Sequence, residues 1–386
     1  MRQKIILTMN TVLKIAALCC LPAAMAGCDQ NSDGDQTMTA SQGWLTRVAT
    51  PSSEFSPGGI ESTIDNVVAE FNKTDQQVGM KISFMPKALD TFFEDAVLGA
   101  NRAYGELGVL GSVVAPERLP GESGENDPEE QLAMFQEQVA DGMLNFGVAP
   151  NSAEIRDKVD MAIANGGVVV TFDSDAPTTQ RQLFVGTNNA EAGKTAGNTM
   201  LAQIGAGKIG TVVILGYTDE GWEDGYSRTQ EAAAVLEAAG HTVVILHSDW
   251  SDYASNVTAI QDAFAAASPA TVGCLGVFNV SYACAEAVVA SQLQSSVKVV
   301  AFDTEPATRQ YMNDGIIQAT HTQRLYYMGY LVPYVIYAIR SLGLERTQQL
   351  FAPLMTNSSH IDTGLDVIHA EKLSEYDAFL DTLHAL

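Results

Sequence analysis

The sequence predicts an α/β protein made of two similar halves, each built on a parallel sheet. The first observation is an uninterrupted apolar run, Val168–Phe172, which suits a strand buried on both faces of such a sheet. The second is that this run stops in acidic and hydroxyl side chains, as does its counterpart Val297–Phe302 in the second half. Similar pairs precede both runs, at Phe146–Ser152 and Leu275–Ser281. We therefore expect two copies of one plan, with ligands bound beyond the carboxyl ends of the strands.

Strands and helices alternate in the first copy in the order that a parallel sheet requires. The predicted strands are Lys81–Met85, Gly108–Val114, Asn145–Val148, Val168–Phe172 and Leu183–Gly186. The predicted helices are Thr91–Leu107, Glu129–Asp141, Ser152–Asn165 and Ala190–Ile204. Thr91 and Glu94 have the spacing of a capping box, which fixes the start of the first helix.

The second copy repeats this alternation. Its predicted strands are Gly210–Leu215, His241–Leu246, Thr271–Val277, Val297–Phe302 and Ile316–His321. Its predicted helices are Glu223–Ala239, Asn256–Ala267 and Tyr282–Leu293. A long helix over Leu325–Leu342 follows, and the tail adds a strand and a helix near Lys372–Leu383.

The amino terminus has the pattern of an export signal, predicted over residues 1–27. A basic front leads into a short apolar stretch, which is too short to span a bilayer. Ala24–Ala26 suits ordinary cleavage, whereas Met25–Cys28 resembles a bacterial lipobox with Cys28 as the lipidated residue. We favour lipidation, so the predicted location is the periplasm or the outer face of a membrane. Residues 28–80 are predicted to be a linker or tether that contains a short amphipathic helix over Gly59–Asn72.

Composition excludes several classes of partner. The formal net charge is −25, with 21 Lys and Arg against 46 Asp and Glu. Nucleic acids and anionic membranes bind clusters of basic residues, so we expect neither as a partner. Gly205–Gly210 spells a dinucleotide motif but follows a helix and precedes a strand, the reverse of what phosphate binding requires. No cofactor is predicted.

The cysteines and histidines do not have the spacing of a metal site, and none is predicted. Cys274 and Cys284 admit a disulfide in an oxidising compartment. The interpretation that we favour is two buried free thiols, one on a strand and one on the helix after it.

Carboxylates and aromatic rings collect near the ends of the predicted strands. Asp173 and Asp303 follow matching strands, and their repeated context favours ligand contact over simple turn capping. Flat rings pack on the apolar face of a sugar while carboxylates and amides bind its hydroxyls. The aromatic candidates, each of which also fits a hydrophobic core, are Phe92, Phe93, Trp222, Trp250 and Tyr282. Because no nucleophile or metal accompanies the two carboxylates, we do not expect an enzyme.

Five segments carry a family resemblance: Val148–Ser152, Thr171–Pro177, Gly186–Lys194, Ala301–Asp303 and Ile361–Val367. In these segments the chain resembles the sugar-binding proteins of ABC importers related to ribose- and galactose-binding protein, which are type I periplasmic binding proteins. The resemblance runs from about Lys81 to Leu386. It implies two Rossmann-like lobes with parallel sheets, joined by a three-strand hinge, with residues 81–187 and 324–358 in the first lobe and residues 188–323 and 359–386 in the second.

The resemblance also implies a set of ligand contacts. Carried over by position, they are Asp90, Phe92, Phe93, Asp173, Ser174, Asp224, Trp250, Asn279, Asp303 and Gln323. Ser174 and Asp224 stand where many relatives have arginine. The loss of two guanidinium groups disfavours ribose and anionic sugars and leaves neutral pentoses, hexoses and polyols.

The function implied is reversible binding of a neutral monosaccharide between two lobes, followed by delivery to an ABC permease in the membrane. A monomer is expected. The alternative is a sensor that presents a sugar or autoinducer to a chemoreceptor or kinase.

Overall fold

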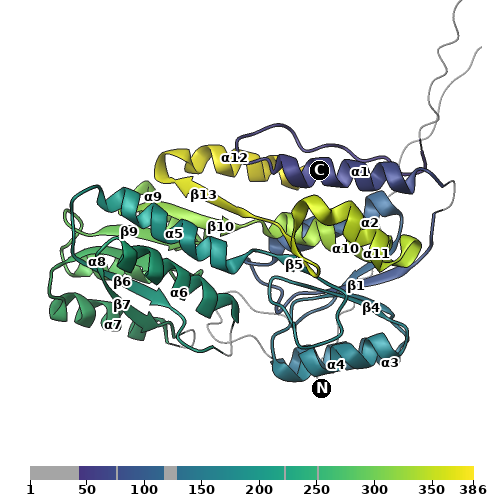
Figure 1. Ribbon diagram of the computed structural model, residues 1–386, viewed down its shortest axis with the longest axis horizontal. Helices are drawn as coiled ribbons and strands as arrows, with labels where there is room; N and C mark the ends of the chain where they lie inside the picture. The colour runs from purple at the N-terminus through teal and green to yellow at the C-terminus, as the bar shows by residue number, and fades with distance from the viewer. Residues whose placement is uncertain (1–42, 75–76, 117–127, 221–222, 250–251) are drawn as a thin grey trace, which may run out of the picture. The chain divides into compact units, whose positions relative to one another are not determined.

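The computed structural model describes residues 43–74, 77–116, 128–220, 223–249 and 252–386. These residues form two α/β lobes with mostly parallel sheets, which confirms the predicted fold class (Figure 1). Cys28, Trp222 and Trp250 lie outside the described residues. In the described part of the chain, no helix combines the length and apolarity needed to cross a membrane.

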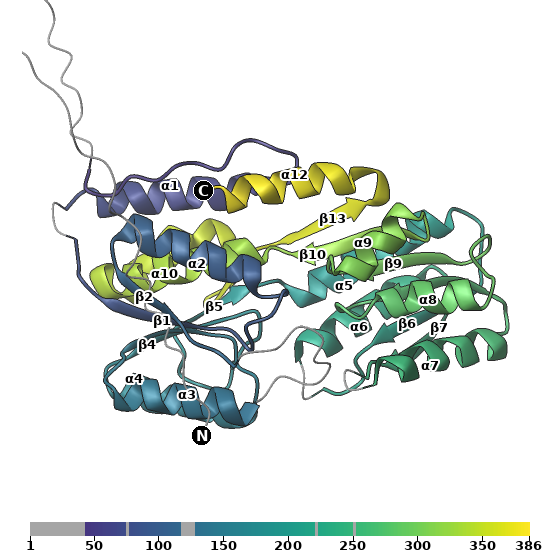
Figure 2. The same cartoon turned by 180° about the vertical axis from the view of Figure 1, so that it is seen from behind.

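Lobe 1 is built on a seven-stranded sheet with the strand order β11-β12-β5-β4-β3-β1-β2. Its strands are β1 (Lys81–Met85), β2 (Leu110–Val113), β3 (Asn145–Val148), β4 (Val168–Phe172), β5 (Leu183–Gly186), β11 (Met355–Asn357) and β12 (His360–Asp362). Only the edge strand β11 runs antiparallel to its neighbour. The helices α2 (Glu94–Leu107) and α10 (Leu325–Leu342) cover one face, and α3 (Pro128–Ala140) and α4 (Ala153–Ala164) cover the other (Figure 2).

Lobe 2 is built on a six-stranded sheet with the order β13-β10-β9-β8-β6-β7. Its strands are β6 (Thr211–Gly216), β7 (Thr242–His247), β8 (Thr271–Gly276), β9 (Lys298–Phe302), β10 (Ile317–Gln323) and β13 (Leu365–His369). Its helices are α5 (Asn189–Ile204), α6 (Glu223–Ala238), α7 (Tyr253–Ala266), α8 (Tyr282–Ala290), α9 (Pro306–Asn313) and α12 (Leu373–His384). The thiols of Cys274 and Cys284 are buried and free, as favoured from the sequence.

The chain passes between the lobes three times. It leaves lobe 1 after β5, returns from β10 into α10, and crosses again between β12 and β13. The third crossing falls at Thr363–Gly364, because β12 pairs with β5 in lobe 1. The border expected between residues 358 and 359 is therefore several residues too early. The strands β11 and β12, helix α9 and helix α11 (Leu344–Phe351) were not predicted.

Helix α10 forms the centre of lobe 1. Every residue from Leu325 to Ile339 is buried, including five tyrosines. The helix lies very close to α2 because both carry glycine at the contact: a β carbon on Gly329 would lie 1.8 Å from the carbonyl oxygen of Ala96. No larger residue fits there without moving one of the two helices.

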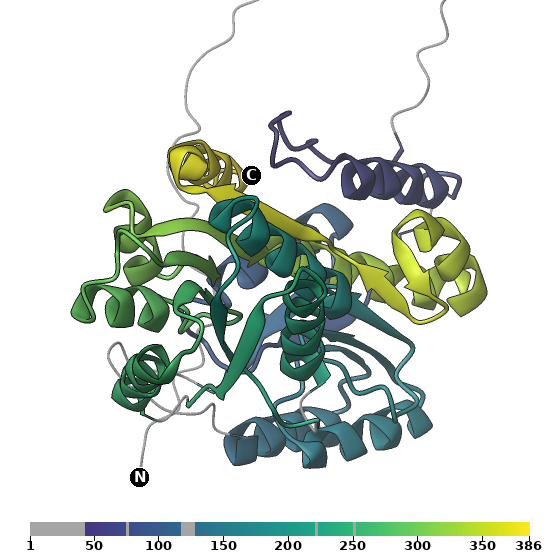
Figure 3. The ribbon, with the colours of Figure 1, turned by 60° about the vertical axis from the view of Figure 1, so that its left-hand side comes forward.

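An arm formed by Gly43–Phe71 packs on this helix, so this part of the predicted tether is folded. The arm runs out as an extended segment and returns as helix α1 (Gly58–Phe71), close to the short helix predicted (Figure 3). At its start, Trp44 packs against Phe71 and Tyr337. At its far end, Phe55 packs edge-on against Tyr376 of α12, with ring centroids 5.1 Å apart.

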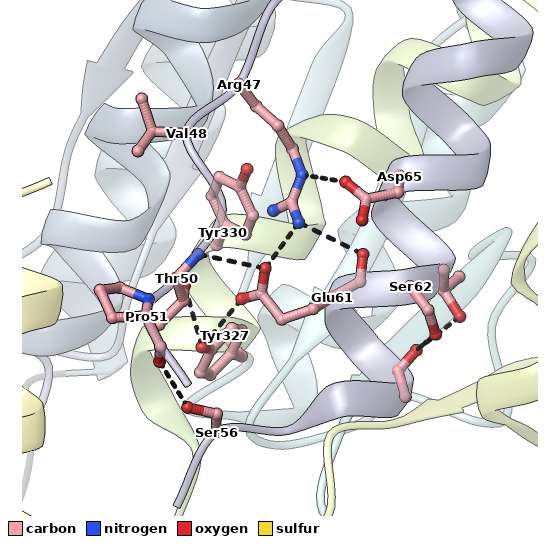
Figure 4. Close-up of polar contacts among 12 residues, drawn as sticks. Arg47, Val48, Thr50, Pro51, Ser56, Glu61, Ser62, Asp65, Tyr327 and Tyr330 are labelled. Atoms are coloured by element: carbon pink, nitrogen blue, oxygen red, sulfur yellow. Dashed lines mark hydrogen bonds and ion pairs between the residues drawn. The ribbon is translucent and has the colours of Figure 1, made fainter. Parts of the chain in front are cut away.

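A partly buried polar network fastens the arm to α10. The Arg47 guanidinium donates to the carboxylates of Glu61 and Asp65 at 2.6 and 2.7 Å, within the arm (Figure 4). The Tyr327 hydroxyl of α10 donates to the other Glu61 oxygen at 3.0 Å. Glu61 thus joins the two sides of the contact, and the charge of Arg47 offsets the cost of burying it.

We expect Phe55→Ala to lower the free energy of unfolding by about 3 kcal/mol, because it removes a buried ring and leaves a cavity beside Tyr376 and Phe379. Urea denaturation followed by circular dichroism measures the change. Val48→Ala is the control, since that side chain is 65% exposed, and should leave stability within about 0.5 kcal/mol. Equal midpoints for the Phe55 variant and the parent would contradict the packing role.

Candidate functional site

The strands β4 and β9 end in the same unusual turn, one in each lobe. The residues directly after them, Asp173 and Asp303, have φ values of 60° and 61°. This left-handed conformation is rare for residues other than glycine, and aspartate is among those that tolerate it best. The Asp173 amide donates to the carbonyl of Val185 in β5, and the Asp303 amide donates to that of His321 in β10. The repeated turn places one carboxylate at the carboxyl edge of each sheet.

A lysine holds the lobe 1 carboxylate. Lys87 follows β1, and its ammonium lies 2.8 Å from Asp173 Oδ2 and donates to Ser174 Oγ at 2.6 Å. All three residues are at least nine-tenths buried. Ser174 also hydrogen-bonds to Asp224 of α6, which belongs to lobe 2. This chain of polar contacts therefore joins the two lobes at the site.

An arginine has the corresponding position in lobe 2. Arg228 of α6 is 3% exposed and donates to Asn189 Oδ1 at 2.6 and 3.1 Å and to the Val277 carbonyl at 2.9 Å. Its guanidinium carbon lies 4.6 Å from the centre of the Phe302 ring. Its charge acts on the aspartates of both lobes, Asp173 and Asp303. Arg228 is thus a central cation of the site.

Two aspartates of lobe 2 have raised pKa values. Burial raises the pKa of Asp303 to about 7, and the negative charges of Glu305 and Asp173 add to the shift while Arg228 opposes it. One oxygen of Asp303, Oδ1, has no hydrogen-bond partner among the described residues. Burial likewise raises the pKa of the partly exposed Asp224 to about 6, although Lys87 opposes the change. Asp224, in contrast to Asp303, accepts the side-chain amide of Asn189 at 3.3 Å.

A second polar group lies beside Asp303. The amide nitrogen of Asn279 donates to the carboxylate of Glu305, whose pKa is raised by burial and by the nearby charge of Asp90. The amide oxygen of Asn279 is buried without a partner in the described part of the chain. Asp90, on the lobe 1 side, accepts the backbone N–H of Phe93 at 3.1 Å. Asp90 and Glu305 therefore bring further negative charge to the space between the lobes.

The predicted aromatic residues are in different environments. Phe92 is partly exposed and meets Phe93 edge-on, with ring centroids 4.9 Å apart. Phe93 is 2% exposed and packs in the core against Phe172. Tyr282 stacks on Tyr253 of the same lobe. Of the predicted aromatic residues that the structure describes, Phe92 and Tyr282 are partly exposed, whereas Phe93 belongs to the core.

The structure brings together most of the predicted polar residues. Asp224 interacts with Ser174 and Asp173, and Asp303 interacts with Asp173. Asp90 and Asn279 join them through Glu305. Gln323 is buried at the end of β10, where the chain crosses back to lobe 1. Within the described residues, no group of three or more His, Cys, Asp or Glu side chains has the arrangement of a metal site.

Sequence reasoning missed Lys87, Arg228 and Glu305. A signal existed for Lys87, which follows a predicted strand by two residues in a chain with few basic side chains. Glu305 has a similar position after β9. Arg228 lies inside a helix, one turn after Asp224, so only the packing of α6 against α5 reveals its place in the site.

Ionisation of Asp303 should oppose folding. Its pKa is about 7 in the folded protein and 3.8 in the unfolded chain, so the penalty is absent below pH 3.8 and complete above pH 7. We therefore expect Asp303→Asn to stabilise the ligand-free protein on the order of 3 kcal/mol at pH 8 and hardly at all at pH 4. Denaturation from pH 4 to 8 measures this. Asp314→Asn, an exposed control, should have no such trend, and a constant effect of Asp303→Asn would refute the shift.

Comparison with known structures supports this architecture. A solute-binding protein of an ABC transporter from Burkholderia graminis, in complex with D-arabinose, is 23% identical, with a TM-score of 0.60 over 78% of this chain and 99% of its own. The arabinose-binding protein AraP from Geobacillus stearothermophilus is 21% identical, with a TM-score of 0.64 over 78% and 99%. The glucose–galactose-binding protein GanP of the same organism is 22% identical, with a TM-score of 0.61 over 77% and 99%. These similarities establish the fold.

A search of curated protein sequences finds no match to this chain. A family model described as "Periplasmic binding protein domain", however, matches residues 82–343. The match spans most of both lobes and leaves the amino-terminal arm outside. On the strength of this match and the two-lobed fold, the chain belongs to the periplasmic binding protein family.

Proposed function

We propose that this protein is the extracytoplasmic sugar-binding component of an ABC importer. The single observation that carries the proposal is the pair of matching aspartates, Asp173 and Asp303, which follow equivalent strands of the two lobes and lie within electrostatic reach of each other. Structures of similar fold are described as binding D-arabinose, glucose and galactose, or D-allose. These relatives do not favour the sensor alternative.

The mechanism is reversible binding rather than catalysis. A sugar hydroxyl donates to the open oxygen of Asp303 from lobe 2, and others bind Asp173 and Lys87 in lobe 1. Phe92 covers the apolar face of the ring, supported from below by Phe93. Because the ligand contacts both lobes, it stabilises the closed form, and three crossing segments allow the rotation. The other residues predicted from the sequence to contact the ligand, including Trp250 and Gln323, are also proposed to bind the sugar.

The closed form then docks on a membrane permease, which receives the sugar. Membership of this family places the protein outside the cytoplasm. The proposal also includes a signal peptide over residues 1–27, a lipid anchor at Cys28 and a monomeric state.

Binding is tested with a thermal-shift screen of pentoses, hexoses and polyols, followed by calorimetry. A ligand at about 100 times its dissociation constant should add about 2.7 kcal/mol of stability. A panel without any response would overturn the proposed function.

We expect Asp173→Ala and Asp303→Ala each to weaken the binding of a sugar found in this screen at least ~10-fold, because each removes a charged acceptor. Calorimetry at pH 7 gives the dissociation constants, and thermal unfolding verifies that each variant is folded. Asp314→Ala, at the exposed residue that directly follows α9, is the matched control and should bind as the parent does. Unchanged affinity in both site variants would remove the two aspartates from the site.

Lipid anchoring predicts that Cys28→Ser moves the protein from the membrane fraction to the soluble fraction, because no thiol remains to carry the lipid. Cys20→Ser is the control, since this residue precedes the predicted cleavage site. Fractionation and the intact mass of the extracted protein measure the outcome. Identical fractionation of both variants would favour ordinary signal cleavage.

A further inference from the structure

The third crossing between the lobes is the central segment of the hinge. On the lobe 1 side, the Thr363 amide donates to the Gly186 carbonyl at 3.0 Å, which continues the pairing of β12 with β5. On the lobe 2 side, Leu365 lies opposite Gln323, where β13 pairs antiparallel with β10. The third crossing therefore changes its partner, from the first crossing to the second, at Gly364.

Gly364 is the residue of the hinge at which backbone rotation is least restrained. It lies between the paired residues of β12 and β13, and among the described residues of the three crossings it alone has a positive φ, of 77°. The other crossings are held by the helices that follow them, because Asn188 caps α5 with its side chain and Arg324 is the N-cap residue of α10. Glycine has no β carbon and adopts backbone conformations that other residues avoid. A hinge needs only a few residues of this kind to absorb a rotation.

One side chain spans this glycine. The Arg324 guanidinium donates to Asp366 Oδ1 from Nη2 at 2.7 Å and from Nε at 3.0 Å. Its Nη1 donates to the Thr363 carbonyl at 3.2 Å. Thr363 and Asp366 lie on opposite sides of Gly364 in the chain. Because the donors of a guanidinium have fixed directions in one plane, the three bonds together favour one setting of the Gly364 backbone.

The surroundings of this contact make its loss costly. Thr363 is 1% exposed and Asp366 is 6% exposed. Burial raises the pKa of Asp366, and the hydrogen bonds and charge of Arg324 oppose that rise. A rotation that separated Arg324 from Asp366 would leave a buried carboxylate without compensation. The contact therefore acts as a clamp on the hinge, formed by Arg324, Thr363 and Asp366.

We propose that Gly364 is the pivot of the lobe rotation and that Arg324 is a positioning residue that limits how far the lobes open. The inference goes beyond the proposed function, because it assigns control of the affinity to two residues that act through the hinge. Loss of the clamp lowers the population of the closed form. The dissociation constant then rises by the same factor for every ligand, since the contacts of the ligand itself are unchanged.

The clamp is tested with Arg324→Lys, which keeps a positive charge beside Asp366 and removes the planar set of donors. The matched control is Arg340→Lys, since Arg340 donates to the Asn145 side chain and the Leu144 carbonyl within lobe 1. We expect the ligand-free Arg324 variant to have a larger radius of gyration than the parent in small-angle X-ray scattering. The control should match the parent, and thermal unfolding verifies that both variants are folded.

Calorimetry with D-arabinose, D-galactose and D-allose measures the effect on binding. Each of these sugars that binds the parent should bind Arg324→Lys ~10-fold more weakly, with one common factor. Gly364→Ala should act in the same direction, because its β carbon disfavours the positive φ and would lie 2.7 Å from Arg324 Nη1. Gly142→Ala is its control: this lobe 1 glycine has a φ of 81° and no described atom within 4 Å of an added β carbon.

Three results would overturn the inference. An unchanged radius of gyration in ligand-free Arg324→Lys would remove the clamp even if no sugar binds, so this inference and the proposed function fail separately. Different factors for the three sugars would indicate a contact with the ligand, through Arg324 or its neighbour Gln323, in place of control through the hinge. Equal affinities for Gly364→Ala and Gly142→Ala would remove Gly364 as the pivot.

Discussion

The left-handed backbone at Asp173 and Asp303 is the constraint on which the site depends. Each residue leaves a fully buried strand end and gives its amide to the next strand, so the turn is fixed by the sheet itself. The conformation costs about 1–2 kcal/mol for an L-residue. That cost is met by backbone hydrogen bonds in both lobes, and the result is a carboxylate at the same place in each.

The other polar residues of the site lie around these two carboxylates. Lys87 forms a buried ion pair with Asp173 at 2.8 Å, which holds the lobe 1 carboxylate in place. Arg228 donates its hydrogen bonds to Asn189 and Val277. Its positive charge opposes the rise in the pKa of Asp303 without cancelling it. The same turn therefore produces two different acids: Asp173 pairs with a lysine of its own lobe, and Asp303 keeps one oxygen without a partner among the described residues.

The fold was predictable because its signals are local. The apolar strands, their polar ends and the alternation with helices are all visible in short stretches, and Asp173 and Asp303 were found from them. The site was only partly predictable, because its charge balance depends on residues from separate elements. Arg228 lies within a helix, and Phe93 belongs to the core, although its neighbour Phe92 does not. For the arm, only the helical spacing of its apolar residues could be recognised in the sequence. Its packing on α10 depends on a contact between Glu61 and Tyr327, which are far apart in the chain.

The amino-terminal arm has a mechanical consequence for the lobes. It is bonded to α10 of lobe 1 through Glu61, and it reaches α12, which follows the last strand of lobe 2, through Phe55 and an ion pair between Glu54 and Lys372. The arm thus adds a non-covalent brace to the three covalent crossings and to the polar contacts at the site, beside the contact of His384 in α12 with Asp95 in α2. Any rotation about the hinge must either carry the arm along with α12 or break its aromatic contact, so the arm adds its own stiffness to the hinge.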